Sequence, residues 1–469
     1  MIFLIAYITG LSKYGLRLLF VIILLCTSIL IIGHIRNRKY RIMDFRKEFR
    51  RIVKKKKPIK TYYPPADSTL LGHAGKREIR VPDNAKHVFV CGTTGSGKTI
   101  ALSNFIKRAI DQDYPALIID GKGDTGQGSI LNILQMLKTN KKLYVINLNN
   151  PSQSDKYNPF KNTSPTVAKD MLINMTDWSE EHYKLNAERY IQRALQLLTI
   201  GNVNLSFNKI IKGLNNDTFI DYSRMLMGKG LIAKEQHMDN IQVAETSGKT
   251  SQSSVARFSA IAESDIGGIF SGDGIDITQA LKEKAIILFI LNPLVYPELS
   301  TAFGRLILID SKKAIGELFK ADIGRTFFIL DEINVYASST LTDLINKSRS
   351  ARVTCVLATQ SLSDLDYACG EAFKEQIIEN CNNYLVMRQN SGVNAEHWAN
   401  ILGTRTTIEV THQLQQKGLD TSATGFGSAK RVREFLYHPD DIKSLKTGQG
   451  IYLSRDTGLD SKIVVNKPF

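Results

Sequence analysis

Short apolar runs alternate with amphipathic stretches along most of the chain. The runs are rich in β-branched and aromatic residues, and most are four to seven residues long, the usual size of a buried strand. They occur at residues 86–91, 116–119, 143–148, 285–291, 326–330, 353–358, 383–387, 451–454 and 462–465. Strands that alternate with helices predict an α/β fold with a parallel, doubly wound sheet.

Residues 164–266 interrupt this alternation. Ser164 and Pro165 have the residue types of a helix N-cap and first helical position, and apolar residues then recur at helical spacing without a convincing strand. We therefore expect an all-α insertion domain at residues 164–266. The doubly wound α/β domain would then comprise residues 66–163 and 267–469, on either side of this insertion. A polar, glycine-rich stretch at residues 417–429 is expected to be a mobile loop.

The N-terminal region has a different pattern. Residues 18–33 carry no charge and are mostly Leu, Ile, Val and Phe, and with residues 14–17 they form about twenty residues. This length crosses a hydrocarbon core of roughly 30 Å, with Arg17 near its edge. We expect residues 1–33 to be a membrane anchor with one N-terminal transmembrane helix. A cleaved signal peptide fits less well, and a helical hairpin that includes residues 2–8 is a minority alternative.

The segment after the apolar run is strongly basic. Residues 34–60 contain thirteen Lys and Arg against Asp44 and Glu48. Positive flanks stay on the cytoplasmic side and are attracted to anionic lipid, so residues 34–65 are predicted to be a juxtamembrane linker and the remainder cytoplasmic. The whole chain has a net charge of +16, and residues 61–469 carry only +3 of it. The basic composition therefore indicates membrane topology rather than a basic DNA-binding surface.

Cysteine and histidine spacings argue against disulfide and zinc sites. The five cysteines include no C-x-x-C pair, and the eight histidines include no H-x-x-x-H pair. The bulk of the chain is expected in a reducing compartment.

A phosphate-binding motif follows the strand predicted at residues 86–91. The sequence GTTGSGKT fits G-x-x-x-x-G-K-S/T, and an amphipathic helix comes next. Glycines let backbone N–H groups turn toward phosphate oxygens, and the helix N-terminus adds positive potential. Lys98 is expected to reach the β- and γ-phosphates of ATP, and the Thr99 hydroxyl to ligate Mg²⁺. The predicted nucleotide-binding residues are Gly92, Thr93, Thr94, Gly95, Ser96, Gly97, Lys98 and Thr99.

Two further strands end in polar residues suited to nucleotide hydrolysis. The run TFFIL ends in Asp331 and Glu332, which we expect to hold Mg²⁺ and to polarise the attacking water, respectively. Gln360 follows the strand at residues 353–358, where ligands bind in open α/β sheets, and is predicted to sense the γ-phosphate or orient the water. The alternatives are that Asp331 and Glu332 are only solvated acids at a strand end, and that Gln360 is only a polar residue at the start of a helix.

The segment at residues 346–352 contains two arginines between these strands. One of them could act as an arginine finger on the nucleotide of a neighbouring subunit. Simple solvation of a surface arginine is an equally good interpretation of the residues alone.

In their order, these features resemble the type IV secretion and conjugation coupling proteins, the TraD/TraG-like group of the FtsK/HerA superfamily. The resemblance covers nearly the whole chain. It rests on the apolar N-terminal segment, HVFVCGTTGSGKT, DGKGD, YNPF, the helical insertion, FFILDE, SRSAR and ATQS. It implies a RecA-like P-loop NTPase that forms hexamers at the bacterial inner membrane. It also assigns catalytic roles to Lys98, Asp331, Glu332 and Gln360, and the trans-acting role to Arg349.

The resemblance further implies partners and an activity. They are DNA, single-stranded or duplex and without sequence preference, relaxase and relaxosome proteins, and inner-membrane components of the secretion channel. The expected activity is DNA-stimulated ATP hydrolysis that moves the DNA–relaxase substrate. Two features depart from the family: the near absence of an outer loop, and the lack of a long acidic tail before Phe469. Substrate docking would then fall to the helical insertion.

Two other functions remain open from the sequence. One is a chromosome-segregation translocase of the FtsK kind. The other is a ring that binds ATP for assembly and docks protein effectors without pumping DNA.

Overall fold

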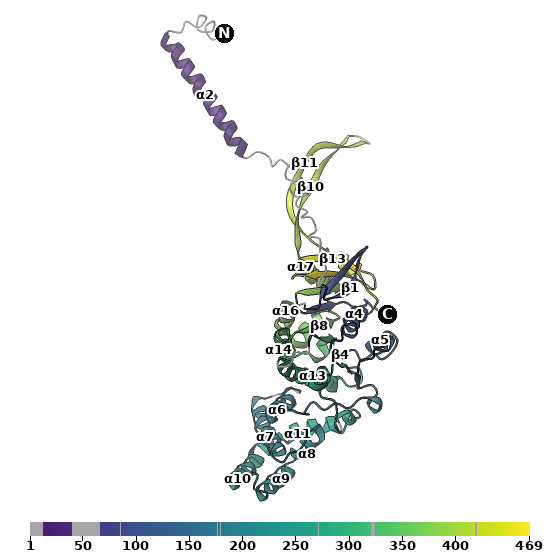
Figure 1. Cartoon of the computed structure of the whole chain (residues 1–469). Coiled ribbons are helices and arrows are strands. Elements are labelled where there is room, and N and C mark those ends of the chain that lie inside the picture. Colours follow the sequence, from purple (N-terminus) through teal and green to yellow (C-terminus); the bar gives the residue numbers. More distant parts are fainter. Residues whose placement is uncertain are drawn as a thin grey trace. The chain divides into compact units, whose positions relative to one another are not determined.

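The computed structural model describes residues 13–39, 66–84, 86–175, 177–178, 180–270, 272–319, 324–417 and 420–469. The chain divides into two compact units. One comprises Met1–Tyr62 and Thr406–Glu434, and the other comprises Tyr63–Arg405 and Phe435–Phe469. The second unit contains the predicted nucleotide site and is described first (Figure 1).

An eleven-stranded mixed sheet forms the centre of the second unit, in the order β2-β1-β13-β12-β9-β3-β8-β7-β4-β6-β5. The seven strands from β9 to β5 are parallel, whereas β12, β13, β1 and β2 pair antiparallel. Their bounds are β1 Ser68–Ala74, β2 Arg77–Pro82, β3 Val88–Cys91, β4 Ala116–Asp120, β5 Leu143–Asn147, β6 Ile286–Ile290, β7 Thr326–Asp331, β8 Val353–Thr359, β9 Asn383–Met387, β12 Gln449–Ser454 and β13 Leu459–Val465.

The prediction of a parallel sheet is therefore wrong for β12, β13, β1 and β2, which form the antiparallel side of the sheet. The hairpin β1–β2 turns at Gly75, whose φ of 62° favours glycine, and it was not recognised in the sequence. The tail strands were recognised, but the direction in which they pair depends on contacts with distant residues. The parallel part follows the expectation: every residue of β3, β4, β6, β7, β8 and β9 is buried, as in strands covered on both faces.

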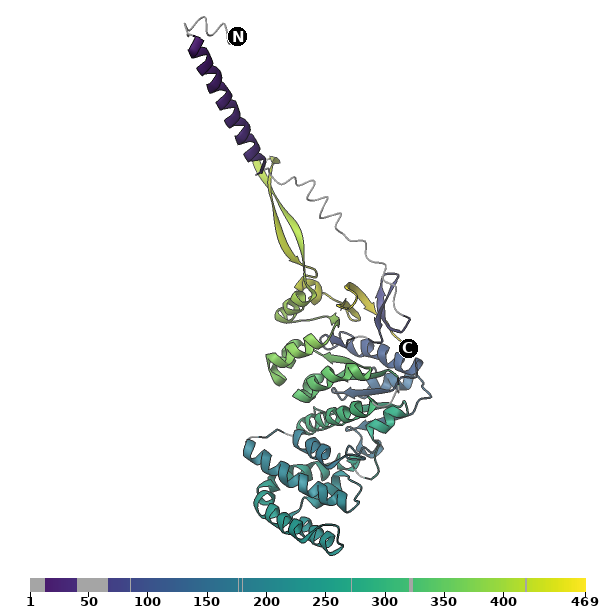
Figure 2. The ribbon, with the colours of Figure 1, turned by 60° about the vertical axis from the view of Figure 1, so that its left-hand side comes forward.

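Helices cover both faces of the sheet. On one face α4 contacts β7 and α5, and on the other α13 contacts α14, which in turn contacts β8 and α16 (Figure 2). The helices are α4 Lys98–Asp111, α5 Ile130–Met136, α12 Ile277–Lys282, α13 Pro297–Leu318, α14 Ser339–Ser348, α15 Leu362–Cys369, α16 Glu371–Asn380, α17 Gly392–Leu402 and α18 Pro439–Lys443. Short 3₁₀ turns η4 (Ile333–Tyr336) and η5 (Arg349–Ala351) follow β7 and α14.

A group of helices lies next to α13 in Figure 1. They are α6 Pro165–Asn174, α7 Glu181–Ile200, α8 Phe207–Gly213, α9 Asn216–Gly228, α10 Lys234–Val243 and α11 Lys249–Ala262. The first begins as expected, with the Ser164 hydroxyl accepting from Val167 N at 3.4 Å. The described part of residues 164–266 has no strand. We call α6–α11 the helical segment; its status as a separate domain stays a prediction.

The other compact unit contains a long two-stranded ribbon and an N-terminal helix. The ribbon consists of β10 (Thr404–Lys417) and β11 (Asp420–Phe435). The expected loop is thus wrong at residue 417 and at residues 420–429, which are strand, whereas residues 418 and 419 lie outside the described part of the chain. Small and polar residues resemble loop composition, but pairing with β10, which alternates polar residues with Ile408 and Val410, makes this segment a strand.

Helix α2 spans Lys13–Lys39 and includes the apolar run at residues 18–33. In the stretches of chain that the structure describes, no helix combines the length and hydropathy needed to cross a bilayer, so the predicted span is not confirmed. The expected hairpin with residues 2–8 and most of the basic linker, residues 40–65, lie outside the described residues.

Candidate nucleotide-binding site

The phosphate-binding loop connects β3 to α4 and needs glycine at several positions. Gly95 and Gly97 have φ angles of 74° and 108°, in the region that other residues rarely adopt. A Cβ on Gly92 would lie 2.6 Å from Ser96 Oγ and 2.7 Å from Met387 Cβ. The loop is therefore wound tightly at the N-terminus of α4, with its backbone amides and the helix dipole at one place.

Two distant segments hold this loop from the side. Thr93 N donates to Arg388 O at 3.0 Å, directly after β9. Gly448 N donates to Ser96 O at 2.7 Å, and Thr447 Oγ1 donates to Gly95 O at 3.0 Å, directly before β12. These contacts were not predicted, since nothing in the local sequence of residues 388 or 447–448 marks them as partners of the loop.

Lys98 lies inside the site. Its ammonium donates to Gly92 O at 2.7 Å and lies 3.6 Å from Glu332 Oε1, and both side chains are less than one-tenth exposed. The lysine is thus held between the loop and the end of β7. A buried cation there is placed to meet the charge of a bound phosphate.

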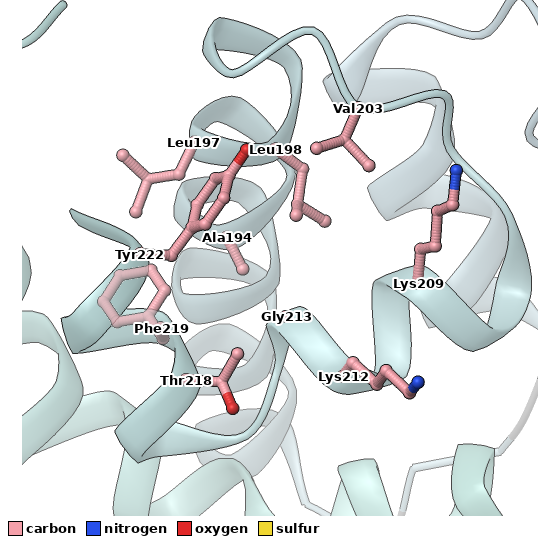
Figure 3. A pocket seen from close by; sticks show the side chains of 10 residues that line it. All are labelled: Ala194, Leu197, Leu198, Val203, Lys209, Lys212, Gly213, Thr218, Phe219 and Tyr222. Atoms are coloured by element: carbon pink, nitrogen blue, oxygen red, sulfur yellow. The ribbon is translucent and has the colours of Figure 1, made fainter. Parts of the chain in front are cut away.

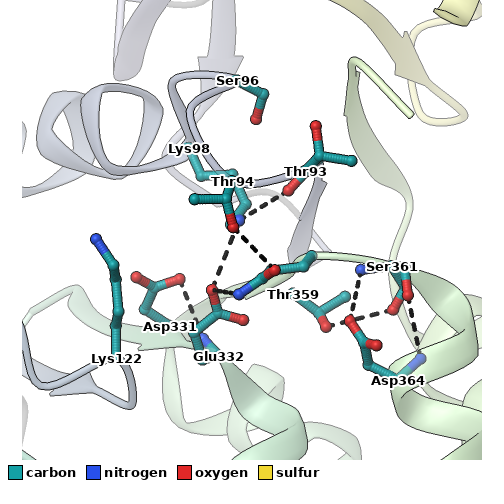
Figure 4. Close-up of polar contacts among 12 residues, drawn as sticks. Thr93, Thr94, Ser96, Lys98, Lys122, Asp331, Glu332, Thr359, Ser361 and Asp364 are labelled. Carbon is teal, nitrogen blue, oxygen red and sulfur yellow. Dashed lines mark hydrogen bonds and ion pairs between the residues drawn. The ribbon is translucent and has the colours of Figure 1, made fainter. Parts of the chain in front are cut away.

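Gln360 connects the loop to the acidic residues through Thr94 and Glu332, both labelled in Figure 4. Thr94 Oγ1 donates to Gln360 Oε1 at 3.0 Å, and Gln360 Nε2 donates to Glu332 Oε1, also at 3.0 Å. The structure therefore brings Lys98, Glu332 and Gln360 together from the segments that follow β3, β7 and β8. The prediction that strand ends place these residues at one edge is consistent with this geometry; their chemical roles stay predictions.

Asp331 and Asp120 are adjacent buried carboxylates. They are partners in the register of β7 and β4. Burial raises the pKa of Asp331 to about 7, with repulsion by Glu332 and Asp120 adding to it and Lys98 opposing it. Burial likewise raises the pKa of Asp120 to about 6, against hydrogen bonds from the amides of Lys122 and Gly123. The carboxylates at these strand ends therefore bring more negative charge into the protein than the single buried ammonium of Lys98 can offset.

That excess charge fits a divalent cation. Thr99, the second residue of α4, and Asp331 are the predicted Mg²⁺ ligands, and their hydroxyl and carboxylate oxygens are donors that Mg²⁺ prefers. No group of three or more His, Cys, Asp or Glu among the described residues could hold a metal alone. Mg²⁺ bound here would take further oxygens from nucleotide phosphates and water, as is usual for this ion.

Glu332 has an unusual backbone. Its φ and ψ are 47° and 54°, a left-handed conformation that costs a non-glycine residue about 1 kcal/mol or more. The Asp331 carboxylate accepts from Glu332 N at 3.0 Å, and the Asp331 carbonyl accepts from the Tyr336 hydroxyl at 2.9 Å. These contacts turn the glutamate side chain from the strand direction toward Lys98 and Gln360.

The structure does not bring Arg349 to this site within one chain. Arg349 is exposed and precedes β8, whereas Gln360 follows it, and seven strand residues separate the two ends by about 20 Å. Burial lowers the pKa of His87, just before β3, to about 4, and the Arg349 charge adds to this. Arg349 therefore lies at the amino ends of the strands, opposite the carboxyl ends where Gln360 lies, and its trans-acting role stays a prediction.

Asp120 and Lys122 were not predicted as site residues. Lys122 forms a 3.0 Å ion pair with Asp124, and the acidic groups of Asp124, Asp120 and Asp331 together raise its pKa. Figure 4 shows Lys122 beside Asp331. The signal was present in the sequence, because Asp120-Gly121-Lys122-Gly123-Asp124 follows an apolar run as Asp331 does.

A tightly wound glycine loop, a buried lysine and acidic residues at the end of β7, two strands from β3, define a nucleotide-binding site of the P-loop NTPase class. A family model described as the central domain of helicase HerA matches residues 76–268. A second, described as the TraM recognition site of TraD and TraG, matches residues 325–447. These two matches confirm the resemblance to TraD/TraG-like coupling proteins and HerA-type P-loop ATPases that the motifs predict.

Solved structures share the fold at low sequence identity. The conjugative coupling protein TrwB is 14% identical with a TM-score of 0.61, over 86% of this chain and 89% of that chain. It has also been solved with ADP and Mg²⁺, at a TM-score of 0.60 and 14% identity. VirB4 of Thermoanaerobacter pseudethanolicus is 11% identical with a TM-score of 0.55, over 86% of this chain and 97% of that chain.

Two similar sequences come from Mycoplasma pneumoniae (strain ATCC 29342 / M129 / Subtype 1), both described as uncharacterized proteins. One is 32% identical over 104 residues, which is 22% of this chain and 69% of that protein. The other is 49% identical over 39 residues, 8% of this chain and 32% of that protein.

Proposed function

We propose that this protein is a membrane-associated ATPase that recruits a DNA–relaxase substrate and translocates it to a type IV secretion channel in conjugation. The observation that carries the proposal is the convergence of Lys98, Glu332 and Gln360 from three strands, with Asp331 beside them. TrwB, a relative in fold, is described as a conjugative coupling protein.

Each residue then has a role in hydrolysis. Lys98 leaves Gly92 O and Glu332 to meet the β- and γ-phosphates of ATP, which frees the glutamate to polarise water. Thr99 and Asp331 would hold Mg²⁺, which when bound would supply positive charge to the phosphates. Gln360, hydrogen-bonded to Glu332 at 3.0 Å, orients the water. Arg349 acts on the site of the next subunit in a hexamer, since it does not reach its own.

The N-terminal region is proposed to hold the protein at the bacterial inner membrane. Helix α2 exposes large apolar side chains between Leu18 and Ile32, a cost in water that lipid would remove. The basic residues at 34–60 would then lie at the cytoplasmic, anionic leaflet. Flotation of the full chain with anionic vesicles, compared with a chain that starts at residue 66, tests this step. Equal flotation of both would contradict it.

The helical segment is proposed to bind the relaxosome partner. It contains a cavity of about 200 Å³ between α7, α8 and α9, with an apolar lining that includes Leu198 and Phe219 (Figure 3). Lys209 and Lys212 lie at the same cavity and form no ion pair with a described residue. An apolar anchor flanked by acidic residues would suit this site, which Leu198→Lys should block without loss of ATP turnover.

A translocase of the FtsK kind and an ATP-binding receptor without a pump have the same nucleotide site. ATP turnover by the full chain, with and without single-stranded DNA, separates them. We expect DNA to stimulate turnover, and Lys98→Ala and Glu332→Gln to abolish it. If DNA leaves turnover unchanged while a relaxase still binds, the receptor is the better assignment. A translocase of the FtsK kind would be stimulated by DNA but would bind no relaxase.

The Arg349 assignment has a separate test. Arg349→Ala should abolish turnover while a fluorescent ATP analogue still binds. Mixing this variant with Glu332→Gln should restore part of the activity, because some interfaces then combine an intact site with an intact arginine. Loss of nucleotide binding in Arg349→Ala, or no recovery in the mixture, would exclude a trans-acting role.

A further inference from the structure

The position of Glu332 depends on the turn that follows it. Glu332 is left-handed, and η4 begins at the next residue. Tyr336 ends this turn, is fully buried, and returns its hydroxyl to the Asp331 carbonyl at 2.9 Å. A strained backbone persists only where its surroundings over-determine it, so the contacts of η4 decide where the glutamate lies.

Helix α13 supplies those contacts. Thr301 Oγ1 donates to Val335 O at 2.9 Å. One turn further along α13, Gly304 lies directly against the Tyr336 side chain: a Cβ on Gly304 would be 2.5 Å from Tyr336 Cβ and 2.9 Å from Cγ. The missing side chain at residue 304 therefore lets the Tyr336 ring occupy the position from which its hydroxyl reaches Asp331.

The next residue of α13 connects this arrangement to the helical segment. Arg305 Nη1 forms a 2.7 Å ion pair with Asp177, in the connection between α6 and α7, and Nη2 donates to Ala337 O at 3.5 Å. Arg257 of α11 donates to Asp177 O at 2.9 Å. Arg305 thus joins the residue after η4 to the segment that leads into α7.

This junction is not closely packed. A cavity of about 650 Å³ and another of about 400 Å³ both have Asp177 and Arg305 in their walls. Asp177 is 88% exposed. Polar contacts therefore join the connection between α6 and α7 to α13 at this point, whereas α6 itself packs on α13 within the apolar core. The connection can therefore shift without breaking that core.

We propose that Tyr336 and Gly304 position Glu332 for hydrolysis, and that the Arg305–Asp177 ion pair makes this position respond to the helical segment. Tyr336, Gly304 and Arg305 are positioning residues, since none of them reaches the nucleotide. Movement of the connection between α6 and α7 is transmitted through Arg305 to Ala337 and η4, and so to the glutamate. The inference rests on ATP hydrolysis by this site and adds to it a route of control.

The first test replaces Gly304 by Ala, with Gly316→Ala of the same helix as its control. A Cβ at Gly316 meets nothing within 4 Å, so both variants add one methyl group to α13 and only one displaces Tyr336. We expect Gly304→Ala to lower kcat by about 10- to 100-fold, the range for a misplacement of about 1 Å. KM and the Kd of a fluorescent ATP analogue should stay within about twofold, and Gly316→Ala should resemble the unaltered chain.

The second test is Tyr336→Phe, which keeps the ring and removes the hydroxyl. A kcat lowered at least about threefold, with KM and the melting temperature unchanged, supports positioning. A change in melting temperature alone would mean that the tyrosine is only structural and would contradict the proposal.

The third test addresses the link to the helical segment. Asp177→Ala should lower kcat by about three- to tenfold without changing nucleotide affinity, because Arg305 loses the partner that orients it. Asp221→Ala removes an exposed ion pair with Arg224 in the helical segment and should change nothing. Unaltered kcat in Gly304→Ala, Tyr336→Phe and Asp177→Ala would overturn the inference, whereas absence of turnover in the unaltered chain would instead overturn the proposed ATPase function.

Discussion

Asp331 and Asp310 are both fully buried carboxylates whose pKa burial raises, but their surroundings differ. Asp310 accepts from the Tyr157 hydroxyl at 2.8 Å and pairs with Lys313 at 2.8 Å, and both contacts lower its pKa, which is about 6. Asp331 is next to Asp120 and Glu332, both of which raise its pKa further, to about 7. The first carboxylate has a cation and a hydroxyl for itself; the second competes with two other acids for Lys98.

This difference contrasts a carboxylate whose charge is offset within the protein with one that we propose to bind a cation. The Asp310 cluster, formed by Tyr157, Thr163, Asp310 and Lys313, joins α13 to the chain just before the helical segment, and Lys313 also donates to Thr163 Oγ1 at 3.0 Å. Its charges are offset within the protein. The Asp331 cluster, formed by Lys98, Asp120, Asp331 and Glu332, has unbalanced negative charge that only a bound cation would offset. Such sites sacrifice stability for activity.

The largest expected effect is on turnover, in Asp331→Asn. The amide oxygen can still accept from Glu332 N, but the charge that would hold Mg²⁺ is lost, so turnover should fall by roughly two to three orders of magnitude. Because repulsion with Asp120 and Glu332 is also lost, the free energy of unfolding should rise by about 1 kcal/mol. Steady-state ATPase assays and urea denaturation measure the two quantities. A less stable variant would contradict the contrast between the clusters.

Lys313→Met should produce the opposite combination. It leaves Asp310 buried without its cation, and breaking a buried pair from one side costs about 3 kcal/mol or more of unfolding free energy. Turnover per folded molecule should stay within about twofold, because Lys313 lies outside the nucleotide site. Denaturation and active-site titration with a fluorescent ATP analogue give both values. A large loss of kcat would show that the Asp310 cluster is not purely structural.

The pH dependence of stability should reveal Asp310 directly. Its folded pKa of about 6 lies above the unfolded value of 3.8, so its contribution is complete below about pH 4 and is lost as the pH rises through 6. Relative to Asp310→Asn, the unaltered chain should gain about 2 kcal/mol of unfolding free energy between pH 7 and pH 4.5. Because both chains have the same nucleotide site, its titration contributes equally to their unfolding free energies and cancels when one is subtracted from the other. A difference that does not vary with pH would mean that the carboxylate titrates normally.

The smallest effect is expected at the neighbouring lysine of α13. Lys312 pairs with Asp343 at 2.9 Å, but both side chains are partly exposed to solvent. Lys312→Met should therefore change the free energy of unfolding by less than about 1 kcal/mol. The same denaturation experiment as for Lys313→Met gives this value. Equal losses at residues 312 and 313 would mean that burial does not account for the strength of the Asp310 cluster.

The nucleotide site could be predicted from the sequence more completely than the antiparallel side of the sheet. Gly92–Thr99, Asp331 and Gln360 each follow an apolar run, and the carboxyl ends of parallel strands meet at one edge whatever the rest of the chain does. The hairpin β1–β2 and the ribbon β10–β11 were missed. Glycine, charged and small polar residues interrupt β1, β2 and β11, and β10, although rich in Thr, Ile and Val, is long, mostly polar and has no buried apolar run. Arg349 was singled out from the sequence, but only the sheet shows that it lies at the opposite ends of the strands from Gln360.

The sequence by itself determined the P-loop, the acidic residues at the end of β7 and the alternation that forms the parallel core, because these follow from local residue type and period. Tertiary structure alone decided that Asp120 faces Asp331, that Thr93 and Ser96 are held by residues 388 and 448, and that Gly304 makes room for Tyr336. Those contacts join residues far apart in the chain, and their energies depend on burial and register that no local pattern encodes.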